Sequence, residues 1–443
     1  MGALLREIIS GLSSGKAYPT SAALFDLAFL VFVVATVGYL VYVATRREAA
    51  WKTGFGFGLL AALALTLALM FRWIAAGWAH PPFTNLYESL VFFVWGIIVV
   101  YLFVEWRYQV KIAGAFVVPL ACLAMGLASL SPNKGIEPLV PALQSVWLHL
   151  HVAVASIGYA AFLTAFVFAA LFLLKDRVRL NWFIAVAAGF AIFAALAATR
   201  GQVLFGVFPM TKIVSHGAEW MPVPLEGGTP GQYEQINLPV AGIFLLFSLL
   251  PFLFALLATI PALLTNEQRA QERLPLIGLA TAWVLLTGVL VGIPVLVSGR
   301  FDTHMAANPY SYAMLVSAWL FALLVLLFCW RYEELLAALP DAKTLDRLGY
   351  NSIMVGFPLM TLVIVTGAIW ANKAWGRPWG WDPKETASLV TWIIYLLYLH
   401  TRLTAGWSGR RSNLVAIVGF LSVVFTYLGV NLLLSGLHAY ATG

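Results

Sequence analysis

The sequence predicts an all-α polytopic membrane protein with about 12 transmembrane helices and an external tryptophan-rich loop. Of its 443 residues, 62% are hydrophobic and only 10% are charged, and the mean hydropathy is +0.89. Ordinary soluble domains are roughly half apolar and about a quarter charged. Apolar spans of about 20 residues each therefore fill most of this chain, which excludes a soluble enzyme carrying one membrane anchor.

Apolar runs bounded by charged or Pro/Gly-rich stretches mark the individual spans. Before the first run, leucine and isoleucine recur at helical spacing over residues 4–12, which predicts a short helix on the membrane surface. The first run is too long for the core of a signal peptide, so we interpret it as a span. The predicted spans are 24–45, 53–76, 88–105, 111–130, 150–174, 181–199, 238–264, 274–298, 310–331, 350–371, 386–402 and 412–436.

The distribution of lysine and arginine predicts the orientation, because basic loops stay on the cytoplasmic side. One of the two alternating sets of loops holds 16 of the 26 basic residues, and the other holds 10. We therefore expect both termini on the outer, periplasmic side of a bacterial inner membrane, together with the connections 131–149, 200–237 and 372–385. This topology accounts for the net charge of +7 without nucleic acid as a partner.

The two cysteines, Cys122 and Cys329, both lie inside apolar runs. They form neither a disulfide framework nor a CxxC redox or zinc motif. The sequence also lacks CxxCH, so the chain is not itself a c-type cytochrome.

A tryptophan-rich stretch is the most distinctive local feature of the sequence. Residues 370–392, WANKAWGRPWGWDPKETASLVTW, hold five of the 17 tryptophans. Most membrane tryptophans form interfacial belts. Here, however, Trp375, Trp379 and Trp381 are interleaved with glycines and prolines that bend the backbone. We interpret the stretch as a folded aromatic platform for a flat apolar ligand.

The acids that follow the tryptophans have a structural explanation. Asp382, Pro383 and Glu385 stand at the N-cap, N1 and N3 positions of the next predicted helix, which predicts a capping box. Direct contact between Asp382 and a ligand remains an alternative to this capping role.

Histidine is scarce, with seven residues in all. His151 begins the fifth predicted span and His438 ends the last one, both at the outer surface, where two neutral imidazoles could supply both axial ligands of a haem iron. His149 is two residues from His151 and points the other way on a helix, so we prefer His151. His400 lies about 21 Å along its span, toward the cytoplasmic side, as either a packed histidine or a functional one.

The remaining histidines, His80, His216 and His304, fall in or beside external loops. We expect them to face solvent or to fasten the loops, with His304 as a spare ligand. Among the ten basic residues outside the inner loops, Lys373 and Arg377 lie in the tryptophan-rich stretch together with Lys384. These cations are candidates to pair with haem propionates.

These residues resemble a known family. WGRPWGWDPKET at 375–386 is similar to the tryptophan-rich WWD signature of haem-handling proteins in cytochrome c maturation, and its DPKET ending favours the CcsA/ResC branch of System II over the CcmC and CcmF branches of System I. Four further segments match in the family's order, and together they cover about half of the chain. They are PFTNLYESLVFF at 82–93, PLVPALQSVWLHLHVAVASIGYA at 138–160, YLHTRLTAGW at 398–407 and GVNLLLSGLHAY at 429–440.

The resemblance implies a component that exports haem b and takes part in its attachment to apocytochrome c, as a holocytochrome c synthase acting with a CcsB/ResB-type membrane partner. In the family, the histidines of the LHV and GLH motifs ligate haem at the outer face, which here implies His151 and His438. The histidine of YLHTR belongs to an intramembrane haem site, which here implies His400. The tryptophan loop holds the porphyrin near the CxxCH cysteines, which bond to its vinyl groups.

The chain also departs from short family members, which run almost directly from the LHV helix to the helix before the tryptophan loop. The expected organisation is therefore an N-terminal transmembrane part at 1–180, an inserted four-helix segment at 181–331 with the external loop 200–237, and a C-terminal assembly core at 332–443. An even number of inserted spans leaves the tryptophan loop on the outer side.

Two other functions remain open from the sequence. A haem lyase or haem-delivery protein of the System I type would share the fold and the haem, but it would need a haem chaperone as donor. A secondary transporter with twelve spans would show repeats between its halves and a polar site at mid-membrane. The sequence shows no such repeat, and its charged residues gather in loops.

Overall fold

The computed structural model describes residues 8, 10–11, 15–78, 80–129, 135–136, 139, 141–176, 180–198, 209–216, 219–222, 235–237, 239–264, 273–288, 290, 305–307 and 309–430. Of the sequence-based predictions, His438, His304 and all but three residues of the surface helix at 4–12 lie outside this part of the chain. Helices dominate, and the chain divides into two compact units, Met1–Arg177 with Glu333–Gly443, and Val178–Tyr332.

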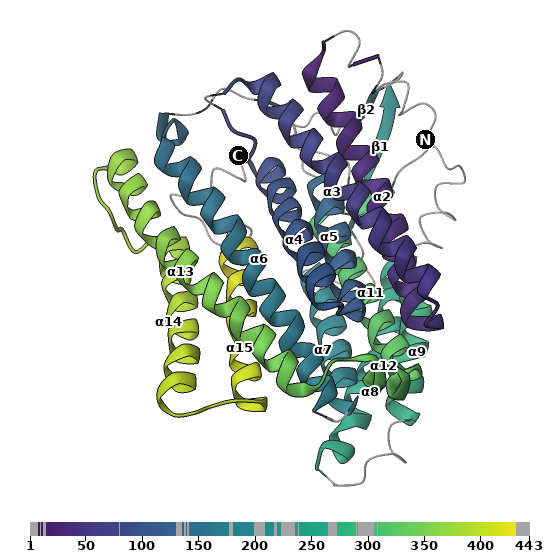
Figure 1. Ribbon diagram of the computed structural model, residues 1–443. Coiled ribbons are helices and arrows are strands. Elements are labelled where there is room, and N and C mark those ends of the chain that lie inside the picture. Colours follow the sequence, from purple (N-terminus) through teal and green to yellow (C-terminus); the bar gives the residue numbers. More distant parts are fainter. Residues whose placement is uncertain are drawn as a thin grey trace. The chain divides into compact units, whose positions relative to one another are not determined.

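The first unit is built from long helices and a few short turns of helix (Figure 1). α6 is its central element, because α4, α13 and α15 all pack against it, while α2 packs against α3 and α5. The elements are α2 (Ala17–Thr45), α3 (Glu48–Ala76), α4 (Leu86–Tyr108), η1 (Lys111–Ala113), α5 (Gly114–Ser129), η2 (Pro141–Leu143), α6 (Val146–Lys175), α12 (Tyr332–Ala338), α13 (Ala342–Trp375), α14 (Pro383–Thr404), α15 (Arg410–Val424) and the π-helical η5 (Phe425–Gly429).

Aromatic packing holds α6 against the C-terminal helices. Phe162 of α6 stacks on Tyr395 of α14 with ring centroids 3.8 Å apart and planes 8° from parallel, and both side chains are fully buried. The pair therefore buries two large aromatic surfaces between α6 and α14.

The second unit packs four helices around one apolar core. The helices are α7 (Leu180–Ala198), α8 (Pro239–Leu264), α9 (Arg273–Thr287) and α11 (Pro309–Trp330). Four short antiparallel strands accompany them, in the order β2–β1–β3 with β4 also paired to β1. The strands are β1 (Pro209–His216), β2 (Glu219–Pro222), β3 (Gln235–Asn237) and β4 (Met305–Ala307).

The strands add to the predicted helical fold, in which 200–237 is an external loop. The sequence does not predict them because they are three to eight residues long and lack a sustained apolar alternation. His216 is the last residue of β1, which pairs it with Glu219 of β2.

Every predicted span coincides with a helix in the described part of the chain. The helices differ in whether their length and apolar composition suffice to cross a membrane. Five are long and apolar enough, and a sixth is formed if Leu315–Trp330 and Tyr332–Ala338, bent by 86°, count as one span. Four more apolar segments, in η1 with α5, in α7, in α8 and in α9, are shorter. The chain is therefore an α-helical multi-pass membrane protein, and the count of about 12 spans stays a prediction.

Candidate functional site

His151 lies in the second turn of α6, near the start of the helix, and its ring is turned toward α13. The imidazole Nδ1 is 2.8 Å from the backbone carbonyl oxygen of Val363. A carbonyl oxygen can only accept, so Nδ1 carries the hydrogen and donates it. In the neutral ring the lone pair then belongs to Nε2, which is the form in which histidine binds a metal.

Gly367 makes this contact possible. A Cβ at that position would lie 3.0 Å from both Cε1 and Nδ1 of His151, closer than packed side chains normally approach. The next turn of α13 presents Trp370, whose ring is stacked 6.4 Å from the imidazole at 23°. Trp370 is 3% exposed, and its Nε1 donates to the carbonyl of Ala142 at 2.8 Å. One face of α13 therefore fixes both the tautomer and the plane of His151.

The tryptophan-rich stretch begins on a helix rather than in a loop. α13 continues to Trp375, four residues beyond the predicted end of its span, and stops where Gly376 adopts φ +73° and donates its N–H to the carbonyl of Asn372. Glycine enters this left-handed conformation without steric cost, which is why helices commonly end there. Trp375 packs edge-on against Trp370 with centroids 4.7 Å apart, so an aromatic series runs from His151 to the end of the helix.

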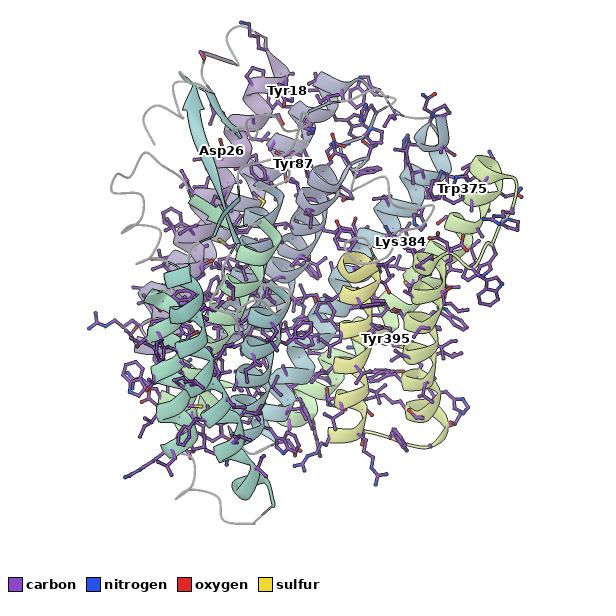
Figure 2. All side chains as sticks on the ribbon, turned by 180° about the vertical axis from the view of Figure 1, so that it is seen from behind. Tyr18, Asp26, Tyr87, Trp375, Lys384 and Tyr395 are labelled. Atoms are coloured by element: carbon purple, nitrogen blue, oxygen red, sulfur yellow. The ribbon has the colours of Figure 1, made fainter. Side chains whose placement is uncertain are left out.

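A short connection of residues 376–382 joins α13 to α14 (Figure 2). Asp382 caps α14 and forms with Glu385 the predicted capping box, with Pro383 in the first turn. The Glu385 carboxylate also accepts hydrogen bonds from the backbone N–H of Gly380 at 2.7 Å and of Asp382 at 3.2 Å. The prediction that these acids start the helix is confirmed, and Glu385 additionally fastens the connection to it.

Two tryptophans project from this connection. Trp379 and Trp381 are perpendicular, with centroids 5.8 Å apart. Trp381 is 70% exposed and has a φ of +56°, which costs a residue other than glycine about 1–2 kcal/mol. Strained backbone is found at ligand sites as well as in turns, which makes this exposed ring a candidate contact.

The basic residues of this region lie in different surroundings. Lys373 and Arg377 are exposed, and the Lys373 ammonium lies 5.8 Å from the ring centroid of Trp147. The Arg377 guanidinium lies against Gly380, where a Cβ would come within 2.9 Å of it. Burial lowers the pKa of Lys384 to about 8, although the neighbouring Asp382 carboxylate opposes that shift. These residues place positive charge around the aromatic rings.

His400 lies on α14 with its side chain exposed, so within this chain it is not a packed core histidine. Exposed apolar residues share its helical face: Leu397 and Leu403 lie about one turn before and after it, and Ile393 lies two turns before it. Two residues away, Arg402 points inward and pairs with Asp346 of α13.

Two further histidines, His149 and His80, contact residues of their own loop or of a neighbouring one. His149 packs edge-on against Phe83, away from α13, which confirms that His149 and His151 face different neighbours. His80 is 9% exposed and its Nε2 hydrogen-bonds to Thr84 at 2.8 Å, so it fastens its loop as expected. Thr84 in turn donates its hydroxyl to Glu88, whose other oxygen pairs with Arg72.

The structure therefore brings His151 together with three groups that the sequence reasoning did not single out: Val363, Gly367 and Trp370. Their spacing of four and three residues on one predicted helix was the available signal. Their partner is more than 200 positions earlier in the chain, so no local pattern pointed to it. His400 is not linked to His151 by any contact described for the chain.

A family model and individual known proteins both match most of this chain. The family model described as cytochrome C assembly protein matches residues 83–223 and 243–438. The cytochrome c biogenesis protein CcsA of a Nostoc species is 32% identical over 86% of each chain. The CcsA proteins of a Synechocystis species and of Gloeobacter violaceus are 30% and 31% identical, over 94% of this chain and 96% and 94% of their own lengths.

The alignments with these relatives extend into the second unit, Val178–Tyr332. Because the alignment with the Synechocystis protein covers 94% of the chain, residues 178–332 are mostly shared with that relative. The chain belongs to the CcsA family of cytochrome c biogenesis proteins and is a multi-pass membrane protein with a role in cytochrome c assembly.

Proposed function

We propose that this protein binds haem b, moves it to the outer face of a bacterial inner membrane, and presents it for covalent attachment to the CxxCH cysteines of an apocytochrome c. The outer site has His151 and His438 as axial ligands of the iron. Trp375, Trp379 and Trp381 contact the porphyrin, and Lys373 and Arg377 pair with its propionates. Asp382 belongs to this site through its position at the start of α14.

The observation that carries the proposal is the geometry around His151. A histidine that ligates iron usually donates its other ring N–H to a carbonyl or carboxylate, which fixes the ring and raises its basicity. His151 makes this bond to the Val363 carbonyl, and Gly367 leaves the space for it. These features fit an axial ligand of the iron better than a histidine that only fills space between α6 and α13.

The surroundings of the tryptophans support the same function. The rings stand at the end of α13 and on the short connection after it, with basic residues on either side. Haem, when bound, supplies an apolar porphyrin, two propionates and the reactive vinyl carbons. The chain's contribution is to orient the porphyrin and to control the iron ligands, so that an incoming histidine of the apocytochrome replaces one of them.

His400 is the proposed ligand of a second, intramembrane haem site on the route from the cytoplasmic side. Its exposure on an apolar face of α14 supports a ligand position that is completed from outside this chain. The proposed source of the other ligand is a CcsB/ResB-type membrane partner. Normal cytochrome c maturation in cells that carry His400→Ala would contradict the proposed ligand role of His400.

The outer site is tested with the full chain purified together with its partner. His151→Gly and His438→Gly are each expected to reduce haem content and to change the absorption spectrum, and added imidazole is expected to restore the spectrum of His151→Gly. Imidazole fills the vacated ligand position, so its rescue separates ligation from a structural role.

His149→Gly is the matched control, because it places the same glycine in the same turn of α6 on a different face. It is expected to retain the wild-type spectrum. Wild-type haem content and spectrum in both His151→Gly and His438→Gly would contradict the proposed ligands, while loss in His149→Gly equal to that in His151→Gly would show a folding effect.

A further inference from the structure

A polar cavity of about 190 Å³ lies in the first unit, and it shares no lining residue with the site described above. It lies where the end of α2, the connection between α4 and α5, and the end of α12 meet. A water molecule occupies about 30 Å³ of liquid, so the cavity has room for several waters or for one phosphate group. Its lining consists of Tyr42, Gln109, Val110, Lys111, Ile112, Ala338 and Leu339.

Arg46 lies beside this cavity, against one of the residues that line it. Its central carbon lies 4.8 Å from the ring centroid of Tyr42, one of the lining residues. The Nη1 atom of Arg46 is buried, and no acceptor among the described residues lies within hydrogen-bonding distance of it. A guanidinium presents five N–H donors, and leaving one buried and unbonded is unfavourable. The arrangement favours a ligand that supplies an oxygen acceptor.

Lys111 adds a second positive charge directly on the lining. Its ammonium lies 2.8 Å from a carboxylate oxygen of Glu48 and 3.8 Å from the ring centroid of Trp51. The ammonium has three donors, so the bond to Glu48 leaves capacity for another acceptor. The Glu48 side chain is 54% exposed, which weakens its hold on the lysine through screening by water. Arg46 and Lys111 together exceed this single negative charge.

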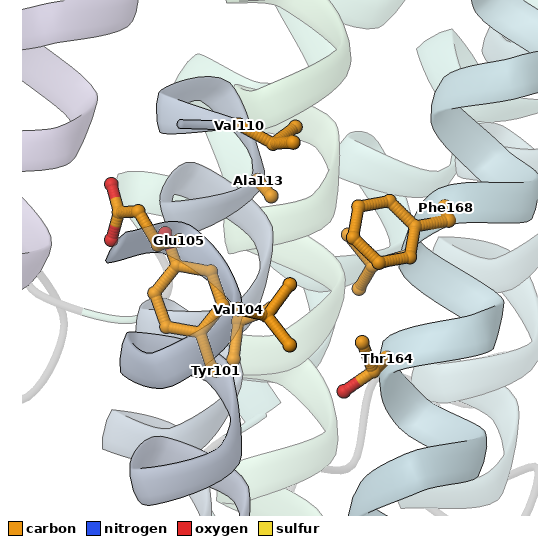
Figure 3. Close-up of a pocket in the computed structure, with 9 residues that line it drawn as sticks. Tyr101, Val104, Glu105, Val110, Ala113, Thr164 and Phe168 are labelled. Carbon is orange, nitrogen blue, oxygen red and sulfur yellow. The ribbon is translucent and has the colours of Figure 1, made fainter. Parts of the chain in front are cut away.

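A second cavity nearby does not have these properties. It lies between α4 and α6, where Tyr101 and Val104 face Thr164 and Phe168 (Figure 3). Its volume of about 10 Å³ holds at most one water molecule. It shares only Val110 with the lining of the larger cavity.

We propose that the larger cavity binds the phosphate group of an anionic phospholipid in the cytoplasmic leaflet. The ligand chemistry is a phosphate oxyanion, received by Arg46 and Lys111. The cavity lies beside loops of the set that holds 16 of the 26 lysines and arginines, which assigns it to the cytoplasmic side. Basic pockets between membrane helices on that side are suited to lipid headgroups, because the headgroup layer surrounds the helix ends.

The test measures thermal unfolding of the full chain in a neutral detergent with added short-chain phosphatidylglycerol, short-chain phosphatidylcholine or inorganic phosphate. We expect phosphatidylglycerol to raise the unfolding temperature of the wild type, and phosphatidylcholine to have little effect. Arg46→Gln and Lys111→Gln should each weaken the apparent affinity for phosphatidylglycerol by about tenfold. Arg46→Lys, which keeps the charge, should retain part of it.

Arg47→Gln is the matched control, since it removes the same charge from the neighbouring, exposed position. It is expected to respond to phosphatidylglycerol as the wild type does. Stabilisation by inorganic phosphate that Arg46→Gln abolishes would support the phosphate site and assign it to a soluble source. Equal responses of the wild type and Arg46→Gln, or equal effects of the two lipids, would overturn the proposal. Native mass spectrometry of the purified variants checks the same ranking if one of them unfolds early.

Discussion

At the scale of single residues, the contact between Gly367 and His151 is the most sensitive feature of the candidate site. Gly367→Ala places a methyl group 3.0 Å from the imidazole, so the ring must move away from the Val363 carbonyl. We expect haem retention by the purified protein to fall about tenfold, as is typical when a residue supporting a metal ligand is altered. Absorption spectroscopy measures the loss.

Gly349→Ala on the same helix is the control. A Cβ there would lie 3.7 Å from its nearest neighbour, which is an ordinary contact. Both substitutions raise the helix propensity of α13 equally, so a shared effect on folding cancels between them. If Gly367→Ala retains haem as well as Gly349→Ala does, the close approach of α13 has no role in positioning His151.

Lys384 provides a prediction about pH. Its folded-state pKa is about 8, below the ordinary value of 10.5, so folding disfavours the charged amine. The resulting loss of stability is fully present below pH 8 and disappears as pH rises through 10.5, where the amine is neutral in both states. Lys384→Met should therefore raise the unfolding temperature at pH 7, and this gain should shrink at pH 10.

Thermal unfolding of the wild type and Lys384→Met at the two pH values measures this difference. Lys373→Met removes an exposed cation from the same region and serves as the control for the change in net charge. A gain from Lys384→Met that is larger at pH 10 than at pH 7 would contradict the assigned sign.

At the scale of elements, an ion pair joins the three C-terminal helices. Arg402 of α14 pairs through two nitrogens with Asp346 of α13, and Asn413 of α15 donates to the same carboxylate at 2.8 Å. The Arg402 and Asp346 side chains are 14% and 12% exposed. We expect Arg402→Gln to lower the free energy of unfolding by about 3 kcal/mol, because it leaves a mostly buried carboxylate without its cation.

Arg410→Gln is the comparison, since Arg410 pairs with Asp176 at a site where the two side chains are 58% and 36% exposed. Its cost should stay below about 1 kcal/mol. Denaturant unfolding of the two variants in the same detergent measures both values. Equal costs would show that the Arg402 pair contributes no more than a surface pair.

The same elements show which features a sequence can reveal. The capping box at Asp382 was predictable, because its residues are neighbours and act through local hydrogen bonds. The end of α13 was misplaced because Asn372 and Lys373 end the apolar run, whereas the helix continues to the glycine that can stop it. The contacts of His151 depend on packing between α6 and α13, and the sequence carries no local trace of that pairing.

At the scale of the whole molecule, the proposed orientation is open to a direct test. We expect a cysteine introduced as Arg377→Cys, in a background with Cys122 and Cys329 replaced by serine, to react with a membrane-impermeant maleimide in intact cells. A cysteine introduced as Lys343→Cys should react only after permeabilisation, because that end of α13 is expected in the cytoplasm. Both positions are exposed. The reverse pattern of labelling would invert the proposed topology.

The length of α13 sets the height of the tryptophans relative to the lipid. Its charged first turns, which include Lys343 and Arg347, stay outside the hydrocarbon. The length of helix available to cross the membrane is therefore measured from Arg347. From there to Trp375 the helix rises about 42 Å, and a tilt of about 40° still leaves about 32 Å against a core of about 30 Å. A bilayer of ordinary thickness therefore leaves the connection between α13 and α14 in the wet headgroup layer, within reach of a water-soluble protein that never touches the acyl chains.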